Sequence, residues 1–331
     1  FLVQNINHVQ KIRRLIIMDT IIQTTLANIK LDNCIYNASG CLCTDNIQLD
    51  SLNISKSGAI LCKSSTINPR EGNSALPRSY FSPDSNYSIN SMGIPNHGYK
   101  YYVDYYLQNN LNKPFIQSLY PFNTTDLVEM FTHINTKITL NKQYLLEINV
   151  SCPNVGNNIV LEKIDEYLDI IRNYNINNIP IGLKLMPYYH SYEFDTISNM
   201  ILKYSNIGYI TCINSVINGL DINVEKESTI ISPNYGLGGI GGNLCLPVAL
   251  SNVYQFSKRL NNVDIVGCGG VSKGEDVFKY ILVGASAVQI GTRLCAEGYN
   301  CFDRISNELI KIMQEHNYQN INQFKGKIKM N

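Results

Sequence analysis

Short apolar runs alternate with longer amphipathic segments from about residue 24 to the end of the chain. Apolar runs of about four to eight residues are typical of buried strands, and apolar residues at every third or fourth position are typical of helices. The pattern predicts strands at Ile35–Asn37, Ala59–Lys63, Phe115–Gln117, Leu145–Asn149, Ile181–Lys184, Tyr209–Cys212, Asp264–Gly267 and Ala287–Gly291. It predicts helices at Asp45–Asn53, Tyr99–Leu107, Thr125–Ile134, Leu161–Tyr174, Asp195–Lys203, Pro247–Arg259, Glu275–Val283 and Phe302–His316.

The regular alternation of strand and helix predicts an α/β fold. Eight strand–helix units in a chain of this length favour a (β/α)8 TIM barrel, with a doubly wound open sheet as the alternative. We expect one domain over residues 24–331 and a frayed N-terminal extension over residues 1–23. Residues 64–98 and 213–246 are expected to form long active-site loops where the strands end, because long loops in compact domains usually carry function.

The composition narrows the possible functions. The net charge is +1 and the pI is ≈ 7.6, so the sequence lacks the basic surface expected of a nucleic-acid-binding protein. No apolar run approaches the length of a membrane span. The 10 cysteines form neither a disulfide framework nor a zinc-type cluster, and with 5 histidines we expect no metal site. Dispersed thiols are typical of a reducing compartment, so we expect a cytoplasmic protein.

One predicted strand leads into a candidate catalytic group. The strand that ends at Asn149 is followed by Ser151-Cys152-Pro153-Asn154. Chemistry in parallel α/β proteins sits at the carboxyl ends of strands, and a proline stiffens the turn. Cys152 is therefore a candidate acid/base or nucleophile. The alternative is a buried structural cysteine, which is the commoner role of this residue type.

Other predicted strands also end in groups that suit a ligand. Lys63 and Lys184 stand at the ends of buried strands, so their ammonium groups are expected to face a ligand rather than bulk water. Small or polar residues stand at further strand ends: Asn37-Ala38-Ser39-Gly40, Ser64-Ser65-Thr66, Asn149 and Asn214-Ser215. Small residues allow a flat molecule to approach the backbone.

Glycine clusters predict a phosphate site. They occur at residues 236–242, at Gly267-Cys268-Gly269-Gly270 and at Gly291-Thr292. Barrels often bind phosphate in the loops after the seventh and eighth strands, through backbone N–H groups and a helix N-terminus. The spacing matches neither a dinucleotide fingerprint nor a P-loop. A phosphate site and two lysines around a flat, electron-accepting ring favour flavin mononucleotide (FMN) as the cofactor.

The order of these motifs resembles the dihydroorotate dehydrogenase family, specifically its soluble class 1A branch, from about Thr24 to Lys329. The resemblance rests on Asn37-Ala38-Ser39-Gly40, Lys63-Ser64-Ser65-Thr66, Arg70-Glu71-Gly72-Asn73, Ile89–Asn96, Asn149–Asn154, Asn214-Ser215, Gly238–Gly242, Cys268-Gly269-Gly270-Val271 and Gln289-Ile290-Gly291-Thr292. It implies a homodimer that oxidises (S)-dihydroorotate to orotate in pyrimidine biosynthesis and reoxidises FMN with fumarate, giving succinate. Class 2 members use a serine base, and class 1B members need an iron–sulfur subunit.

The resemblance also implies residue roles. Cys152 matches the base that removes the carbon-5 proton while the carbon-6 hydride passes to FMN, and Lys63 matches the residue that holds the substrate carboxylate. The implied substrate pocket consists of Lys63, Asn90, Met92, Gly93, Ile94, Asn149, Asn154, Asn214 and Ser215. The implied cofactor site consists of Ala38, Ser39, Gly40, Lys63, Ser64, Asn149, Lys184, Gly239, Gly269, Gly270, Gly291 and Thr292.

Three stretches depart from the family pattern. The lid that follows Asn154 is shorter than the usual Pro-Gly-Lys-Pro stretch, so it is expected to close differently. The loop at Ser74-Ala75-Leu76 is one residue longer. Ile217 stands where the family has a glycine, and isoleucine would be strained there if the position required a positive φ.

Other functions fit parts of the sequence. A related FMN flavoprotein that acts on dihydrouracil would share most motifs but would not need a carboxylate site. A sugar-phosphate isomerase or lyase on a TIM barrel would explain the glycine clusters, but neither the Ile89–Asn96 loop nor the two lysines. A flavin-binding scaffold without activity is the non-enzyme alternative.

Overall fold

The structure, a computed structural model, describes residues 21–139, 143–150, 161–174, 176, 178–204 and 206–330. At its centre is a sheet of eight parallel strands in the order β3-β16-β15-β10-β9-β8-β7-β4. The strands are β3 (Ile35–Asn37), β4 (Ile60–Leu61), β7 (Phe115–Leu119), β8 (Tyr144–Asn149), β9 (Ile181–Leu185), β10 (Ile207–Cys212), β15 (Asp264–Cys268) and β16 (Ala287–Ile290). All eight predicted strands are present, and their ends differ from the predicted ends by a few residues at most.

A side chain joins the two outermost strands of this sheet. The Asn37 amide at the end of β3 donates to the Leu61 carbonyl (2.6 Å), and its Oδ1 accepts from the Leu61 N–H (2.9 Å). Nearer the start of the strands, the Gly58 N–H donates to the Ile35 carbonyl (2.8 Å). These bonds take the place of a regular ladder between β3 and β4. The predicted TIM barrel is therefore confirmed, and the open-sheet alternative is wrong.

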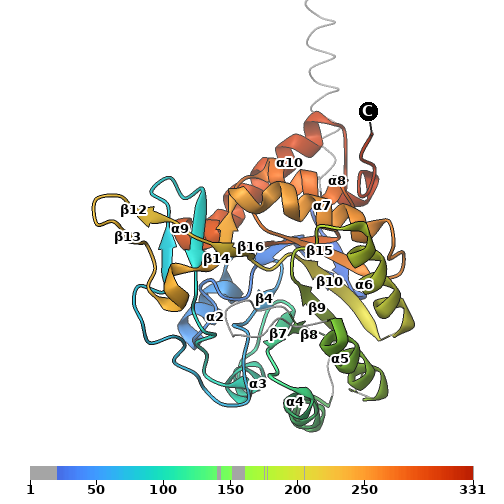
Figure 1. The fold of residues 1–331 in the computed structure, drawn as a ribbon. Helices are drawn as coiled ribbons and strands as arrows, with labels where there is room; N and C mark the ends of the chain where they lie inside the picture. Colours follow the sequence, from blue (N-terminus) through green and yellow to red (C-terminus); the bar gives the residue numbers. More distant parts are fainter. Residues whose placement is uncertain are drawn as a thin grey trace, which may run out of the picture.

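Helices surround the barrel, as Figure 1 shows. They are α2 (Asn46–Ile54), α3 (Tyr99–Gln108), α4 (Thr124–Lys137), α5 (Leu161–Asn173), α6 (Ser191–Lys203), α7 (Leu246–Ser257), α8 (Gly274–Leu282), α9 (Thr292–Glu297) and α10 (Cys301–Glu315). Local caps fix two of the starts, because Asp45 accepts from the Gln48 N–H and Asn123 accepts from the Asp126 N–H. Of these helices only α9, which is short, was not predicted. None of the helices within the described ranges has the length and apolarity needed to cross a membrane.

The barrel separates two hydrophobic cores. The inner core fills the barrel interior with residues such as Leu61, Leu145 and Val266. The outer core packs the strands against the helices and contains most of the buried aliphatic and aromatic side chains. Ile22 belongs to the outer core, and the Ile21 N–H donates to the Gln319 carbonyl (2.8 Å), so the described chain is part of the domain from its first residues. The remainder of the predicted extension, residues 1–20, lies outside the described residues.

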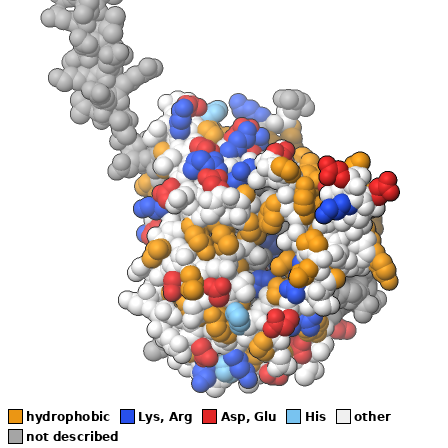
Figure 2. All heavy atoms as spheres, turned by 90° about the vertical axis from the view of Figure 1, so that its left-hand side faces the viewer, with side chains coloured by type: hydrophobic (Ala, Val, Ile, Leu, Met, Phe, Trp, Pro, Cys, Tyr) orange, Lys and Arg blue, Asp and Glu red, His pale blue; other side chains and the backbone are white. Residues whose placement is uncertain are grey.

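The segments predicted as two long loops contain a second, antiparallel sheet. It has the order β11-β14-β6-β5 and consists of β5 (Ser79–Phe81), β6 (Tyr87–Asn90), β11 (Val216–Gly219) and β14 (Gly238–Gly242). A small hairpin of β12 (Ile222–Asn223) and β13 (Ser228–Thr229) extends from it. The two segments expected as long active-site loops therefore contain short strands that pair with each other. The sheet lies to the left of the barrel in Figure 1, and Figure 2 shows hydrophobic side chains gathered on the face that it presents.

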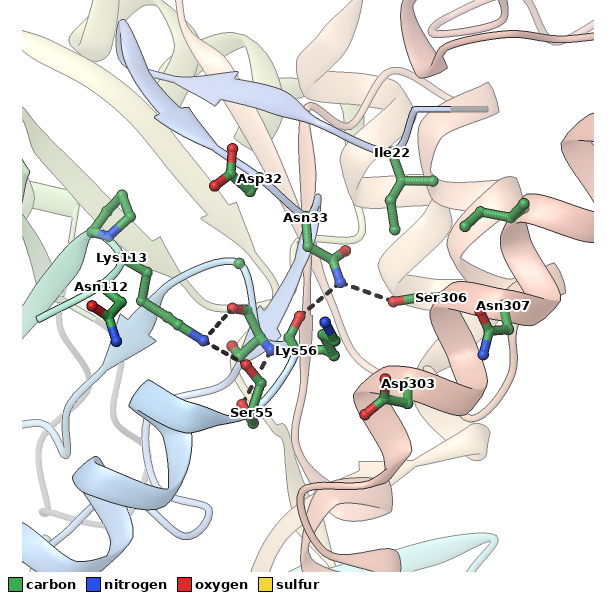
Figure 3. Close-up of a pocket in the computed structure, with 14 residues that line it drawn as sticks. Ile22, Asp32, Asn33, Ser55, Lys56, Asn112, Lys113, Asp303, Ser306 and Asn307 are labelled. Atoms are coloured by element: carbon green, nitrogen blue, oxygen red, sulfur yellow. Dashed lines mark hydrogen bonds between the residues drawn. The ribbon is translucent and has the colours of Figure 1, made fainter. Parts of the chain in front are cut away.

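The opposite end of the barrel carries a polar pocket of about 400 Å³ (Figure 3). Its lining residues Asn33, Gly58 and Pro114 precede β3, β4 and β7, so it lies at the amino ends of the strands. The ammonium of Lys113 donates there to the carbonyls of Leu52 (3.0 Å), Ser55 (2.8 Å) and Ser57 (2.8 Å). These carbonyls lie at or just beyond the last turn of α2, so Lys113 satisfies groups that a helix end leaves open.

Replacing Lys113 by methionine is expected to lower the free energy of unfolding by about 2–3 kcal/mol. The substitution keeps the aliphatic stem but leaves three partly buried carbonyl groups without their charged donor, and each such loss is costly. Urea denaturation measures the effect as a lower transition midpoint. Lys56→Met is the matched control, because Lys56 lines the same pocket, is exposed, and should change stability by less than about 0.5 kcal/mol. Equal midpoints for the two variants would contradict the role given to Lys113.

Candidate active site

A continuous set of hydrogen bonds links the carboxyl ends of several barrel strands. The Ser64 N–H, just after β4, donates to Ser39 Oγ (2.7 Å), which follows β3. Asn149 at the end of β8 donates from Nδ2 to Ser64 Oγ (3.1 Å) and accepts at Oδ1 from the Asn214 amide (3.2 Å). Asn214 Oδ1 in turn accepts from the Ser215 N–H (2.9 Å). Five predicted site residues therefore form one connected group.

Lys63 faces this group from the loop after β4. Its N–H donates to the Cys43 carbonyl (2.9 Å), which fixes the backbone. A Cβ placed on Gly40 would lie 3.8 Å from the Lys63 ammonium nitrogen, so the ammonium lies beside Gly40. The Lys63 ammonium therefore lies between the loops that follow β3 and β4.

The second sheet lies against these residues. The Asn90 amide at the end of β6 donates to the Gly239 carbonyl on β14 (3.2 Å). A Cβ on Gly239 would come within 2.7 Å of the Ser215 Cβ, so only glycine allows this approach. The glycine-rich segment was predicted to supply backbone amides to a phosphate, and in the structure it is a strand with partners on both sides. Its glycines bring Asn90 and Ser215 close to each other.

The residues after β16 meet the same sheet. A Cβ on Gly241 would lie 2.8 Å from Ser88 Oγ and 2.9 Å from Thr292 Oγ1, and these two hydroxyls are 3.0 Å apart. Gly291 lies beside Ala38, because a Cβ there would be 3.6 Å from the Ala38 Cβ. Ala38, Gly291 and Thr292 therefore lie together. The sequence did not single out Ser88, whose hydroxyl faces Thr292.

Gly269 and Gly270 follow β15 in conformations that favour glycine, with φ values of +125° and +78°. A Cβ on Gly270 would lie 2.5 Å from the Leu246 Cβ at the start of α7, and a Cβ on Gly269 would lie 3.2 Å from the Ala249 Cβ. The close approach of this turn to α7 explains why both positions are glycine.

Met92, Gly93 and Ile94 form the turn that follows β6. The Asn73 N–H donates to the Met92 carbonyl (2.9 Å), and Arg70 Nε donates to the Gly93 carbonyl (3.3 Å). Gly93 and Ile94 both have positive φ values, of 72° and 56°. The segment that contains Arg70 and Asn73 therefore holds the backbone of the predicted substrate loop through two hydrogen bonds.

Lys184, at the carboxyl end of β9, reaches into the barrel and donates to Gln289 Oε1 (2.8 Å). Gln289 Nε2 donates to Glu147 Oε2 (2.9 Å), which also accepts from Thr211 Oγ1 (2.7 Å). Burial disfavours the Lys184 ammonium, but the nearby Cys268 and Glu147 outweigh this and raise the pKa of Lys184 above its ordinary value. The sequence assigned no role to Glu147, Gln289 or Thr211, although Gln289 stands in one of the family motifs and a glutamate inside an apolar strand was a visible signal.

Cys152 and Asn154 lie outside the described residues, so their predicted roles are not tested by the structure. The described cysteines are all free thiols, and they form no group with histidine or acidic residues that could hold a metal ion. Cys43 contacts this part of the site, because its carbonyl accepts from the Lys63 N–H and its Sγ accepts from the Gly40 N–H. Burial raises the pKa of Cys43 to about 11, although the Gly40 N–H and Lys63 oppose the effect. Its thiol is therefore neutral at ordinary pH.

The departure at Ile217 causes no backbone strain. Ile217 is not among the residues with a positive φ, whereas its neighbour Asn218 is, at 61°. Asparagine tolerates this region better than branched residues do. The family's glycine position is thus occupied by a residue in an ordinary conformation, and the adjacent asparagine makes the turn in β11.

Comparison with known proteins agrees with this geometry. The family model for dihydroorotate dehydrogenase matches residues 21–313. Proteins named dihydroorotate dehydrogenase (fumarate) are 38% identical over 301 residues in Trypanosoma cruzi and 40% identical over 306 residues in Kluyveromyces lactis. Both alignments cover 90% of this chain and 95% of the relative.

The fold is shared with a solved structure of low sequence identity. It matches a crystal structure of DHODH in complex with ferulenol from Eimeria tenella with a TM-score of 0.75 and 16% identity, over 92% of this chain and 88% of that one. At this identity the match supports the barrel architecture alone. The family model and the 38–40% identical relatives carry the assignment, and they show that the chain belongs to the dihydroorotate dehydrogenase family, in its class 1A branch.

Proposed function

We propose that this protein oxidises (S)-dihydroorotate to orotate with FMN as cofactor, as a step of pyrimidine biosynthesis. The observation that carries the proposal is the near full-length similarity to relatives named dihydroorotate dehydrogenase (fumarate). The connected group of Ser39, Ser64, Asn149, Asn214 and Ser215 supports it, because amides and hydroxyls at the ends of barrel strands suit the polar edge of a pyrimidine.

The described residues fit an FMN molecule. Ala38 and Gly291 lie next to each other with small or absent side chains, which suits a flat ring, and the backbone N–H groups of the turn at Gly269 and Gly270 suit a phosphate. Lys63 and Lys184 supply positive charge on the same side of the barrel, where it would stabilise negative charge that develops on the ring. When bound, FMN supplies the hydride acceptor. The full set proposed to hold it is Ala38, Ser39, Gly40, Lys63, Ser64, Asn149, Lys184, Gly239, Gly269, Gly270, Gly291 and Thr292.

The remaining residues are proposed to bind and deprotonate the substrate. Cys152 takes the proton from carbon 5, and Lys63 with nearby backbone amides holds the carboxylate. The pyrimidine edge is held by amides and hydroxyls, and the turn after β6 covers the substrate. The proposed pocket consists of Lys63, Asn90, Met92, Gly93, Ile94, Asn149, Asn154, Asn214 and Ser215.

We further propose that fumarate reoxidises the flavin, giving succinate, and that two copies form a homodimer in the cytoplasm. The names of the relatives support fumarate as acceptor. Val224, between β12 and β13, and Tyr235, just before β14, are 85% and 94% exposed, and a second copy would cover such apolar side chains. The free described thiols are consistent with a reducing compartment.

Anaerobic reduction by dihydroorotate followed by reoxidation tests the proposal. We expect the protein to be yellow, dihydroorotate to bleach it, and fumarate to restore the colour faster than NAD or a quinone does. Bleaching by dihydrouracil but not by dihydroorotate would reject the substrate. Fast recovery with NAD or a quinone alone would reject fumarate, and a colourless protein that binds no FMN would reject the cofactor.

A further inference from the structure

The barrel interior contains a buried polar chain that connects two opposite charges. Lys184 on β9 donates to Gln289 on β16, and Gln289 donates to Glu147 on β8. Gln289 and Glu147 are fully buried, and Lys184 is 7% exposed. The orientation of the Gln289 amide follows from chemistry, because an ammonium only donates and a carboxylate only accepts. The Gln289 amide therefore links the Glu147 carboxylate to the Lys184 ammonium by two consecutive hydrogen bonds.

Within the described part of the chain, one carboxylate oxygen of Glu147 accepts two hydrogen bonds and the other accepts none. Oε2 accepts from Gln289 and from Thr211, whereas Oε1 is buried and has no hydrogen-bond partner among the described residues. A buried carboxylate with half of its acceptors unused costs stability. A positive charge inside the barrel offsets part of this cost. Lys184 carries such a charge and is linked to Glu147 through Gln289.

We infer that Glu147 is a positioning residue which, through Gln289, keeps the Lys184 ammonium charged and oriented toward the flavin. The inference rests on the proposed function, since it takes FMN to be the group that Lys184 contacts. Lys184 stands at the carboxyl end of its strand, whereas Glu147 lies two residues inside β8, below Asn149. Glu147 therefore acts from beneath the site and through another side chain.

Without the Glu147 carboxylate, burial should lower the pKa of Lys184. Burial lowers the pKa of a lysine, and Glu147 is one of the groups that oppose it here. In Glu147→Gln the Lys184 ammonium should lose its proton as the pH rises through the range where wild type stays charged. A charge-assisted hydrogen bond to FMN is worth about 10-fold or more in affinity, so FMN binding should weaken with rising pH.

Several other titratable groups lie near the hydrogen-bonded residues Lys184, Gln289 and Glu147. They are Tyr36, Cys62, Tyr209, Cys212 and Cys268. Burial raises the pKa of Tyr36, Cys62, Tyr209 and Cys212, so these four groups stay neutral from pH 6 to 9.5. Cys268 contacts Lys184 directly. The double variant Glu147→Gln/Cys268→Ser removes the thiol but keeps a hydrogen-bonding group next to Lys184. It should still bind FMN more weakly as the pH rises.

The test measures the FMN dissociation constant of the holoenzyme from pH 6 to 9.5, by ultrafiltration and flavin fluorescence of the filtrate. We expect Glu147→Gln to match wild type at pH 6 and to bind FMN about 10-fold or more weakly at pH 9.5. The double variant Glu147→Gln/Gln289→Glu moves the carboxylate next to Lys184 and keeps a hydrogen bond between positions 147 and 289, now donated by the amide at 147. The hydroxyls of Thr211 and Tyr36, which contact Glu147 and Gln289, can reverse their bonds because a hydroxyl both donates and accepts. This double variant should restore the wild-type profile, which a merely structural role would not predict.

The outcomes separate this inference from the proposed function. A wild-type protein that binds no FMN would reject the proposed function. Wild-type binding with an identical profile for Glu147→Gln would reject only the inference. If Glu147→Gln does not fold, Gln289→Met takes its place, since it keeps the side-chain volume but breaks the link, and the same loss at high pH is expected. Gln117→Met is the control. Gln117 is a buried glutamine on β7 that donates to the Tyr99 carbonyl and not to Glu147, so this variant should show the wild-type pH profile of FMN binding.

Discussion

Replacing Cys152 by alanine is expected to slow the reduction of the bound flavin by dihydroorotate about 10²- to 10⁴-fold. This is the usual contribution of a general base, and the resemblance gives Cys152 that role. The supporting geometry is that of β8, whose end at Asn149 lies in the connected group at the barrel mouth, three residues before the thiol. Anaerobic stopped-flow measurement of flavin bleaching gives the rate directly. Affinity for FMN should change little, because Cys152 is not assigned to the cofactor.

The pH profile separates a base from a structural thiol. An ordinary cysteine has a pKa of about 8.5, and only the thiolate accepts a proton, so the wild-type rate should rise with pH until the thiol is ionised. Cys301→Ala is the control, because Cys301 is a buried thiol on α10 to which no role is assigned. It should retain the wild-type rate and profile. A flat wild-type profile together with an unimpaired Cys152→Ala variant would exclude Cys152 as the base.

The barrel could be predicted from the sequence because its strands are buried on both faces. β7 and β9 are buried at every position, and such strands appear in the sequence as continuous apolar runs. The helices were predicted for the complementary reason, since each buries one face against the strands. The carboxyl ends of parallel strands meet at one end of a barrel, so residues as distant in sequence as Ser39 and Asn214 were expected to lie together, and they do.

The second sheet could not be predicted in the same way. β5 is three residues long and no residue in it is fully buried, and β14 consists of four glycines and one isoleucine. Glycine is rare in strands and common in loops, so local propensity pointed to a loop. What makes β14 a strand is its pairing with β6 and β11, which are distant in sequence. Tertiary contacts therefore overrode propensity.

The buried chain of Glu147, Gln289 and Thr211 could have been found from the sequence. Each residue interrupts an otherwise apolar strand, and a charged side chain in such a strand needs a partner because burial of an isolated charge is costly. The sequence could not supply the partner's identity. Lys184, Gln289 and Glu147 come from three strands, and only the order of the strands and their register bring the side chains together.

Replacing Lys63 by methionine should remove the enzyme's preference for the free carboxylate of its substrate. A charge-assisted hydrogen bond from an ammonium to a carboxylate is worth about 1.5–3 kcal/mol, which corresponds to a loss of about 10- to 150-fold in kcat/KM for dihydroorotate. The uncharged methyl ester of dihydroorotate cannot make this bond with full strength. Wild type should therefore prefer the acid over the ester, and Lys63→Met should use both with similar kcat/KM.

The ratio of the two substrates makes this test specific. Any general damage to the site, including weaker FMN binding, lowers kcat/KM for both substrates and leaves their ratio unchanged, whereas loss of the carboxylate contact changes the ratio. Lys100→Met is the matched control, because Lys100 is an exposed lysine on α3, and the variant should keep the wild-type ratio. A Lys63→Met variant that still prefers the acid as strongly as wild type would show that another group binds the carboxylate. Because the ammonium lies beside Gly40, which is assigned to the cofactor, a simultaneous loss of FMN affinity would place Lys63 in contact with both molecules.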